Sequence, residues 1–291
     1  MLLRDFITLS QDSLSELYPK DESAAIVSRL CSELLDIKPY THILEPEFTL
    51  SSVQEERLSG ALGRLLSGEP LQYITGYQDF YGYRFKVSPA VLIPRPETEY
   101  LCRLVLDRIK MTFGERSSSP DIIDLCSGSG CISWTLAAEL PEAKVTGVDV
   151  SSDALAVSRS QQICSNVPDF IQADVLLPSL LPSLFPSDRK FDIIVSNPPY
   201  VKESEKAVMC RNVLDYEPGL ALFVEDDNPL VFYHAVADFA QSLLSPSGFG
   251  AVEINESLGE QTVRVFRDRG FGNVSLEDDL SGKHRFVFFQ R

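Results

Sequence analysis

The sequence predicts an α/β fold in which a small helical domain precedes a mostly parallel, doubly wound sheet of seven strands. Two observations support this prediction. From residue 120 onward, short apolar runs of strand character alternate with segments of helical periodicity. Before about residue 70, apolar residues recur only at helical spacing. Strands that alternate with helices are joined by right-handed crossovers, so most neighbouring strands run parallel and helices cover both faces of the sheet.

Residues 1–72 are expected to form the helical domain. Ser52 and Glu55 have the spacing of a capping box at a helix start, and Gly68 is expected to end that helix. No catalytic cluster is visible in this region, which we interpret as a recognition or packing module. Two apolar stripes define its clearest helices: Val27, Leu30, Cys31, Leu34 and Leu35, then Leu58, Ala61, Leu62, Leu65 and Leu66.

Residues 73–95 are predicted to form a β-hairpin linker, and residues 96–291 the sheet domain. Gly82 lies at the expected turn between aromatic, β-prone segments, and Pro96 suits the first turn of a helix. The last two strands have no helix between them, so one of them is expected to be antiparallel. The expected strands are 122–126, 144–150, 170–173, 191–196, 249–254, 273–277 and 285–290; the helices are 131–140, 152–164, 229–244 and 257–269; residues 117–119 and 176–187 are surface connections.

The composition excludes several classes of protein. The 291 residues include 42 acidic and 26 basic side chains, and the net charge of -16 disfavours sequence-independent binding to nucleic acid. Six cysteines are scattered without a C-x-x-C pair and only three histidines are present, so no metal site is expected and the thiols are expected to be free in a reducing cytoplasm. No apolar run is long enough to span a bilayer, and no signal-peptide core is present.

A glycine-rich turn follows the first strand of the predicted sheet. Glycines let the backbone approach a ligand closely and turn sharply into the next helix. A dinucleotide fingerprint would place a third glycine at position 133, where this chain has Ser133, so a pyrophosphate site is disfavoured. Taken alone, the turn fits a ligand loop and a tight turn equally well. Its residues are Cys126, Ser127, Gly128, Ser129 and Gly130.

Acidic residues end the next two strands. Asp149 can accept hydrogen bonds from both hydroxyls of a ribose, and Asp174 can accept from an adenine amino group. Either residue alone is explained as well by a helix cap. Because ligands bind at the carboxyl ends of such strands, the three features together favour a nucleoside without a pyrophosphate. S-adenosylmethionine fits that description.

The fourth strand ends in Asn197-Pro198-Pro199-Tyr200. A plain turn would explain this tetrapeptide, but after a buried strand it resembles the motif of methyltransferases that act on planar NH2 groups. The lone pair of such a nitrogen is delocalised. The Asn197 side-chain oxygen and the Pro198 carbonyl can accept both N–H bonds, and Tyr200 can stack on the flat group. Catalysis would then rest on positioning and preorganised electrostatics, without a covalent enzyme intermediate.

From about residue 70 to residue 291, the chain resembles the HemK-type glutamine-N5 methyltransferases of peptide chain release factors. This resemblance implies a Rossmann-like, S-adenosylmethionine-dependent methyltransferase that modifies the glutamine of a Gly-Gly-Gln loop on class I release factors and so supports translation termination. The helical domain would then help to dock that protein. The segments that support the resemblance are 71–76, 80–82, 92–99, 126–130, 197–200 and 217–222.

The resemblance also implies roles for single residues. Cys126 to Gly130 would line the methionine portion of the cofactor, Asp149 would hold the ribose, and Asp174 and Val175 would flank the adenine. Asn197 to Tyr200 would hold the target glutamine, with Asn197 also on the cofactor side. The family usually has glycine where this chain has Cys126, which leaves a positive φ angle less favourable at that position.

Some alternatives remain open from the sequence. Arg95 and Glu97 either order a loop over the cofactor or cap the following helix. An adenine-N6 methyltransferase of nucleic acid shares the tetrapeptide, but the charge of -16 opposes it. A non-catalytic cofactor-binding protein is a further alternative, opposed by the intact tetrapeptide. We expect a monomer whose negative surface faces basic surface on its protein partner.

Overall fold

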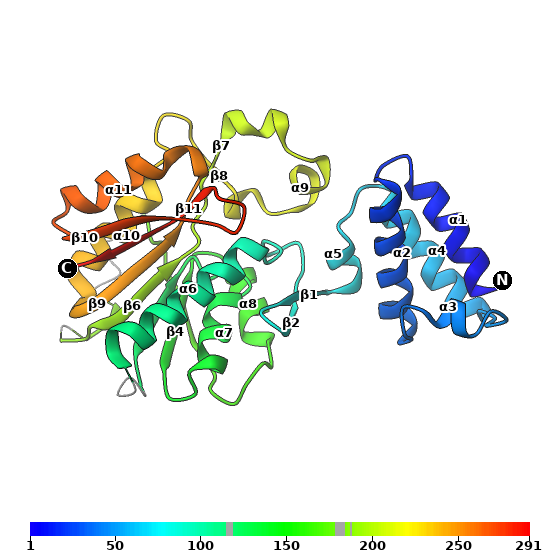
Figure 1. The fold of residues 1–291 in the computed structure, drawn as a ribbon, viewed down its shortest axis with the longest axis horizontal. Coiled ribbons are helices and arrows are strands. Elements are labelled where there is room, and N and C mark those ends of the chain that lie inside the picture. Colours follow the sequence, from blue (N-terminus) through cyan, green and yellow to red (C-terminus); the bar gives the residue numbers. More distant parts are fainter. Residues whose placement is uncertain (115–118, 178–183, 187) are drawn as a thin grey trace. The chain divides into compact units, whose positions relative to one another are not determined.

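The computed structural model describes residues 1–114, 119–177, 184–186 and 188–291. The chain divides into two compact units, one of residues 1–77 with 210–216 and one of residues 78–209 with 217–291 (Figure 1). Most of the two expected surface connections, residues 117–119 and 176–187, lies outside the described residues.

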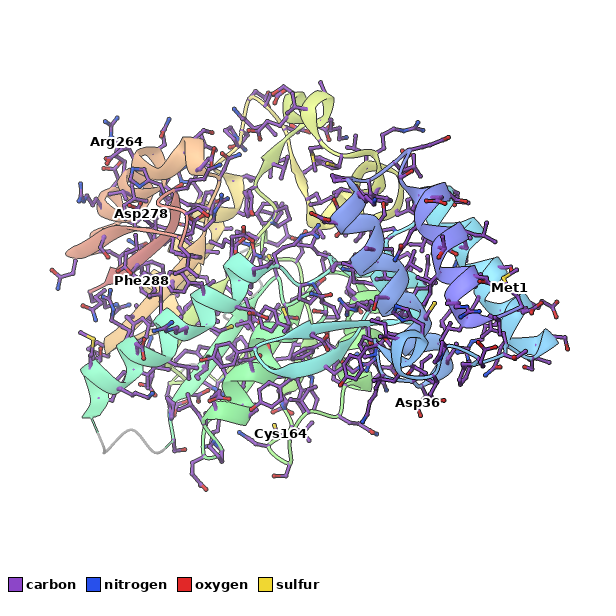
Figure 2. All side chains as sticks on the ribbon, turned by 45° about the vertical axis from the view of Figure 1, so that its right-hand side comes forward. Met1, Asp36, Cys164, Arg264, Asp278 and Phe288 are labelled. Carbon is purple, nitrogen blue, oxygen red and sulfur yellow. The ribbon has the colours of Figure 1, made fainter. Side chains whose placement is uncertain are left out.

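The first unit is helical, as its apolar periodicity predicts. Its helices are α1 (Leu3–Leu14), α2 (Lys20–Leu35), α3 (Thr41–Leu44), α4 (Ser52–Leu66), α5 (Leu71–Thr75) and α9 (Arg211–Tyr216). Both predicted apolar stripes contribute to one core, in which Val27, Leu30 and Leu58 are fully buried. Asp36 ends α2 in a left-handed conformation with φ 54° (Figure 2).

The capping box of α4 is one residue earlier than the sequence pattern suggests. The side chain of Ser51 accepts from the backbone N–H of Gln54, and the side chain of Gln54 accepts from the backbone N–H of Ser51. Ser52 and Glu55 are therefore inside the helix, and the prediction for that pair is wrong. Both pairs have the same spacing, and only the Ser51 backbone is extended at the helix start, as an N-cap residue must be.

The second unit begins with a hairpin and a long helix. Strands β1 (Tyr77–Phe80) and β2 (Tyr83–Lys86) are joined by Tyr81 and Gly82, both at positive φ, so the predicted turn at Gly82 is confirmed. Two central residues with positive φ match the twist of a tight hairpin. Helix α6 (Pro96–Phe113) then starts with proline in its first turn.

In the part of the chain that the structure describes, the sheet has seven strands in the order β10-β11-β9-β6-β3-β4-β5. Only β11 runs against the others, so the predicted antiparallel strand is the last one. The strands are β3 (Asp121–Leu125), β4 (Lys144–Asp149), β5 (Asp169–Gln172), β6 (Phe191–Ser196), β9 (Leu244–Glu253), β10 (Asn273–Asp278) and β11 (His284–Gln290). The accompanying helices are α7 (Cys131–Glu139), α8 (Ser152–Ser160), α10 (Val231–Leu243) and α11 (Gly259–Asp268). Strands β7 (Val201–Lys202) and β8 (Phe223–Val224) form a separate, short parallel pair. Turns of 3-10 helix lie at Glu203–Val208, Gly219–Ala221 and Glu256–Leu258.

Two boundaries differ from the sequence expectation by more than two residues. Helix α8 ends at Ser160 because Gln161 is extended and its side-chain amide bonds the backbone of Lys86, its Nε2 donating at 2.9 Å and its Oε1 accepting at 2.9 Å. Strand β9 begins at Leu244, although Pro246 and Gly248 disfavour a strand there. Residues 249–253 pair with β11, but residues 244–248 have no partner on that side, where a proline is tolerated.

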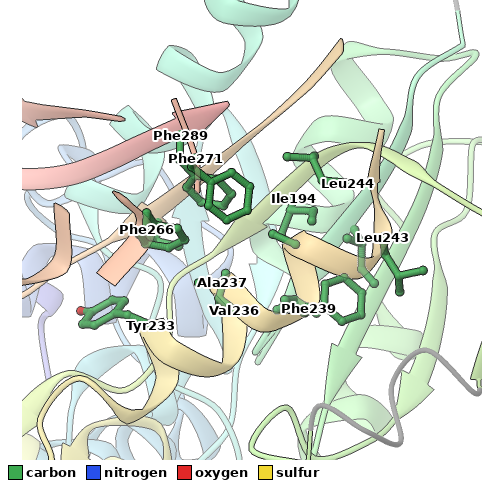
Figure 3. Close-up of a cluster of buried hydrophobic side chains, with 14 of the residues drawn as sticks. Ile194, Tyr233, Val236, Ala237, Phe239, Leu243, Leu244, Phe266, Phe271 and Phe289 are labelled. Carbon is green, nitrogen blue, oxygen red and sulfur yellow. The ribbon is translucent and has the colours of Figure 1, made fainter. Parts of the chain in front are cut away.

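Apolar cores cover both faces of the sheet. One face packs against α10 and α11, and the other packs against α6, α7 and the hairpin. Figure 3 shows α10 within the first core, to which Val236, Phe239 and Leu243 contribute buried side chains. The rings of Phe266 and Phe289 stack with centroids 4.0 Å apart, and a Cβ at Gly250 would overlap the Phe289 ring.

Candidate active site

A cavity lies at the carboxyl ends of strands β3, β4, β5 and β6. We name the residues at 126–130, 149–151 and 173–176 the loop wall, and Asn197–Tyr200 with Thr98 the amide wall. Further lining comes from residues 90–92, 94–95, 131–132, 154, 218, 220–221 and 232. Of the predicted cofactor and substrate residues, nine line the cavity: Cys126, Ser127, Gly128, Ser129, Asp149, Asp174, Val175, Asn197 and Pro199; Arg95, whose role the sequence left open, lines it as well. Gly130, Pro198 and Tyr200 are adjacent but do not line it.

The glycine-rich turn adopts left-handed backbone at three positions. Cys126, Gly128 and Gly130 have φ angles of 63°, 54° and 77°. Cys126 therefore keeps the positive φ that its side chain disfavours. Nothing lies within 4 Å of the point where a Cβ of Gly128 would stand, so the bare backbone there faces open space. Burial raises the pKa of the Cys126 thiol well above its usual value, which keeps it protonated and unreactive.

Asp149 holds the glycine-rich turn to the next strand. Its Oδ2 accepts from the Gly128 N–H at 2.8 Å, and its Oδ1 accepts from the Ser151 N–H at 2.9 Å. Burial raises the pKa of Asp149, and these backbone bonds oppose that shift. Each carboxylate oxygen keeps a further lone pair, so the side chain can still accept from a ligand hydroxyl.

The loop wall suits a polar ligand with an apolar part. The Oγ of Ser127 is buried without a hydrogen-bond partner, although this residue lines the cavity. Orphaned buried hydroxyls cost free energy unless a ligand or water satisfies them. Val175 is 5% exposed and offers an apolar surface beside Asp174. The loop wall thus offers hydroxyl groups and backbone amides for hydrogen bonds, together with an apolar surface for a ring. These groups suit a nucleoside with a charged tail.

A buried acid lies behind the loop wall. Asp124 is fully buried in β3, and its Oδ2 accepts from the Ser133 hydroxyl at 2.7 Å, while its Oδ1 has no partner. Burial raises the pKa of Asp124 to about 7. Sequence reasoning missed this residue because it stands inside an apolar strand rather than at its end.

The amide wall is held by a chain of four side chains. Asn197 donates from Nδ2 to Thr98 Oγ1 at 3.0 Å, and Thr98 donates to Glu253 Oε2 at 2.7 Å. Tyr200 donates its phenol to the other oxygen, Glu253 Oε1, at 3.0 Å. Both Thr98 and Glu253 are buried. The Tyr200 hydroxyl is thereby directed to Glu253 at the end of β9.

Thr98 and Glu253 were not recognised from the sequence as site residues. Glu253 ends a buried strand, which is the same signal that identified Asp149, so strand-end position could have found it. Thr98 belongs to the segment 92–99 that supports the family resemblance. Nothing in the sequence indicates that the two residues meet, since 155 positions separate them.

Arg95 bridges two segments that cover the cavity. Its guanidinium donates to Glu217 Oε1 at 2.5 Å, and the Ile93 N–H donates to Glu217 Oε2 at 3.1 Å. The Arg95 side chain makes no capping bond at the start of α6. Of the two roles left open by the sequence, the contacts favour the ordering of segment 92–95 by Glu217, whose side chain is 1% exposed.

The described ranges contain no group of three or more His, Cys, Asp or Glu side chains arranged to hold a metal ion. No helix within these ranges combines the length and apolar character needed to cross a bilayer. Cys164, labelled in Figure 2, follows α8 and is not among the residues that line the cavity.

Sequence comparisons agree with this geometry. The family model described as methyltransferase small domain matches residues 101–215, and the model described as PrmC N-terminal domain matches residues 8–76. The release factor glutamine methyltransferase of Bacteroides thetaiotaomicron is 36% identical over 287 residues, which cover 97% of this chain and 97% of that protein. Its counterpart in Flavobacterium psychrophilum is 35% identical over 289 residues, 99% of this chain and 98% of that protein.

Solved structures share the fold. The hMettl16 catalytic domain, solved in complex with a MAT2A 3′UTR hairpin, aligns with a TM-score of 0.54 at 13% identity, over 84% of this chain and 82% of that one. The 16S rRNA methyltransferase RsmC of T. thermophilus, solved with AdoMet and guanosine, aligns with a TM-score of 0.50 at 18% identity, over 74% of this chain and 49% of that one. At these identities the likeness concerns the fold alone.

The seven-stranded fold and the cavity at its strand ends define a methyltransferase of the doubly wound class. Nearly full-length similarity then narrows the class, and the chain belongs to the release factor glutamine methyltransferase family. Its cofactor is S-adenosylmethionine. The sequence-based predictions of the fold, the enzyme class and the cofactor are thereby confirmed.

Proposed function

We propose that this protein transfers a methyl group from S-adenosylmethionine to the side-chain amide nitrogen (N5) of the glutamine in the Gly-Gly-Gln loop of class I peptide chain release factors. Methylation of this loop would support translation termination. The observation that supports the substrate most directly is the similarity, along 97% of the chain, to a protein named release factor glutamine methyltransferase.

The loop wall is the proposed cofactor site. S-adenosylmethionine, when bound, supplies an electrophilic methyl group on a positively charged sulfur. Residues 126–130 would line its methionine portion, Asp149 would accept from the ribose hydroxyls, and Asp174 with Val175 would flank the adenine. Two observations support this assignment: the Ser127 hydroxyl has no hydrogen-bond partner among the described residues, the Gly128 backbone faces open space, and both residues line the cavity.

The amide wall is the proposed site of the target glutamine. An amide nitrogen is a poor nucleophile because its lone pair is delocalised into the carbonyl. Asn197 lines the cavity, its Nδ2 is occupied by Thr98, and no described residue donates to its Oδ1. That oxygen and the Pro198 carbonyl can accept the two N–H bonds of the glutamine, which favours a pyramidal nitrogen whose lone pair is free to react.

Proline and tyrosine complete this proposed site. Pro198 and Pro199 are buried and restrict the backbone that presents the acceptors. Tyr200, which is adjacent to the cavity, would stack its ring on the glutamine amide while its hydroxyl stays bonded to Glu253. Catalysis then consists of positioning and electrostatic stabilisation, and no protein nucleophile is required.

The helical unit and the surface charge suggest how the partner is chosen. We assign residues 1–72 to docking of the release factor, residues 73–95 to the hairpin linker and residues 96–291 to catalysis. Residues 1–80 carry 13 acidic and 6 basic side chains, so this part is strongly negative. Basic surface on the release factor would complement it, and the association should weaken as salt rises. We expect a monomer that works in the cytoplasm.

A transfer assay with two alternative substrates, tested separately, examines the proposal. Purified class I release factor and duplex DNA are each incubated with enzyme and labelled S-adenosylmethionine at low and high salt. We expect label on the release factor, less at high salt, and none when its loop glutamine is replaced by alanine. Salt-sensitive labelling of DNA with none on the release factor would instead support the adenine methyltransferase, while cofactor binding without any transfer would support a non-catalytic binding protein.

A further inference from the structure

The orientation of the Asn197 side chain matters because its two ends have opposite hydrogen-bonding character. The oxygen accepts and the NH2 group donates, and only an oxygen facing the cavity can accept from a substrate N–H. A rotation of the amide by half a turn would exchange the two ends at almost no cost in shape. Some neighbouring group must therefore fix which end faces the cavity.

The hydrogen bonds behind Asn197 contain such a group. An ionised carboxylate can only accept, so Glu253 requires Thr98 to donate its single hydroxyl proton toward Oε2, a bond of 2.7 Å. The Thr98 oxygen then has only lone pairs left to offer. Asn197 consequently has to present its NH2 to Thr98, at 3.0 Å, and its oxygen to the cavity.

We infer that Glu253 and Thr98 are positioning residues that fix the acceptor end of Asn197 toward the target amide. Neither residue needs to touch the substrate for this role. Tyr200 reinforces the arrangement, because its hydroxyl donates to the second oxygen of Glu253 at 3.0 Å and leaves both oxygens engaged as acceptors. The inference deepens the proposed function, and its activity tests rest on that proposal.

Protonation of Glu253 would remove the fixed donor-to-acceptor order of the hydrogen bonds from Asn197 through Thr98 to Glu253. A neutral carboxyl can donate to Thr98, whose proton is then free to point at Asn197, and the oxygen of Asn197 turns away from the cavity. Burial raises the pKa of Glu253 to about 7, and the bonds from Thr98 and Tyr200 oppose that shift. The ionised, directing form is therefore favoured as the pH rises through about 7.

Other ionisable groups face Glu253 from the elements packed around it. The positive charge of Arg285 on β11 favours the ionised form of Glu253, and the acidic Glu97 on α6 opposes it. The thiols of Cys102 on α6 and Cys131 on α7 stay neutral because burial raises their pKa values. Burial likewise raises the pKa of Tyr233 on α10, whose hydroxyl donates to the Glu253 backbone carbonyl.

A pair of threonine variants tests the inference by activity. T98V keeps the shape but removes the hydroxyl, whereas T98S keeps the hydroxyl. We expect T98V to lower kcat for release factor methylation by about 10-fold or more, with KM and cofactor Kd within about threefold, while T98S rescues most of the rate. T262V is the matched control, because Thr262 in α11 is also buried but its hydroxyl donates to the backbone carbonyl of Leu258 rather than to Glu253. Equal kcat values for T98V and T98S would overturn the inference.

The pH profile supplies a readout that a purely structural role would not change. In the wild type, kcat should fall as the pH decreases through about 7, the pKa of Glu253. In E253Q the side chain cannot ionise, so kcat should be lower at high pH and the inflection should disappear. An inflection near pH 7 that persists in E253Q would overturn the role of Glu253.

A measurement without substrate separates this inference from the proposed function. If the wild type methylates no release factor, the proposed function fails, and the side-chain amide NMR signals of Asn197 decide the inference alone. We expect these signals to shift in T98V and in E253Q but to stay in place in T262V. Unchanged Asn197 signals in T98V would overturn the inference whatever the substrate of the enzyme.

Discussion

The two walls of the cavity are held in place in different ways. On the loop wall, Asp149 binds backbone N–H groups of Gly128 and Ser151, so the turn is fixed by main-chain contacts between successive strand ends. On the amide wall, side chains meet from segments far apart in sequence, since Asn197 is 99 positions from Thr98 and Thr98 is 155 positions from Glu253.

A buried acid lies behind each wall, and the two acids have different partners. Glu253 receives two hydroxyl donors, one on each oxygen. Asp124 receives one, from Ser133, and its other oxygen has none. An unpartnered oxygen is tolerated in a neutral carboxyl group more easily than in a carboxylate. These contacts indicate that the amide wall fixes the direction of side-chain hydrogen bonds, whereas the loop wall fixes a backbone conformation.

The largest expected effect is on the amide wall alone. N197A removes the acceptor for the target amide, so we expect kcat to fall by about 100-fold to 1,000-fold. Because Asn197 belongs to the amide wall and its side chain bonds Thr98 and no loop-wall residue among those described, we expect the cofactor Kd measured by calorimetry to change by less than about threefold, even though the family resemblance also places Asn197 on the cofactor side. Methyl transfer at an undiminished rate in N197A would contradict the assigned mechanism.

The buried acid behind the loop wall should show in the pH dependence of stability. The pKa of Asp124 is about 7 in the folded protein and 3.8 in the unfolded chain, so the folded state holds the proton over that range. The part of the unfolding free energy that this proton contributes is therefore lost as the pH rises through about 7.

We expect D124N to remove about 3 kcal/mol of the decline in unfolding free energy between pH 5 and pH 8. Denaturant titrations of both proteins at the two pH values measure it. The same decline in D124N as in the wild type would show that Asp124 is already ionised in the folded state.

A smaller effect is expected on the loop wall alone. D149N leaves only one oxygen for two backbone donors, so one of the Gly128 and Ser151 N–H groups faces an NH2 group instead. We expect the cofactor Kd to rise by about 10-fold to 100-fold, with little change in kcat at saturating cofactor. A fall in kcat without a change in Kd would erase the proposed division between the walls.

The smallest effect is expected at Cys126. C126G relieves the strain of a left-handed backbone at φ 63°, which is worth about 1 kcal/mol. The lost side-chain packing and the greater conformational entropy of the unfolded chain oppose this gain by a similar amount. The unfolding free energy should therefore change by less than about 1 kcal/mol, and the cofactor Kd by less than about threefold. A tenfold loss of cofactor affinity would indicate that the Cys126 side chain contacts the ligand.

Much of the fold follows from local patterns in the sequence. Strand β6 (Phe191–Ser196) coincides with the predicted strand because its apolar run is bounded by turn residues. The end of α8 and the start of β9 could not be predicted in the same way. Gln161 ends its helix by bonding Lys86, and Pro246 is tolerated in β9 because one side of the strand is unpaired.

The candidate site divides along the same line. Asp149 and Asn197 could be found because each ends or follows a strand, and parallel strand ends meet at one edge of the sheet. Thr98 could not be assigned to the amide wall, since its contact with Asn197 depends on how α6 packs against the sheet. The pairing of Arg95 with Glu217 depends on tertiary packing in the same way.

The most direct test of the account is mass spectrometry of a class I release factor after incubation with the enzyme and S-adenosylmethionine. Fragmentation assigns any added methyl group to a residue and to a side-chain atom. We predict one added methyl group on the amide nitrogen of the Gly-Gly-Gln glutamine, and none with N197A. A release factor that stays unmodified, or one that is methylated at another residue, would contradict the account.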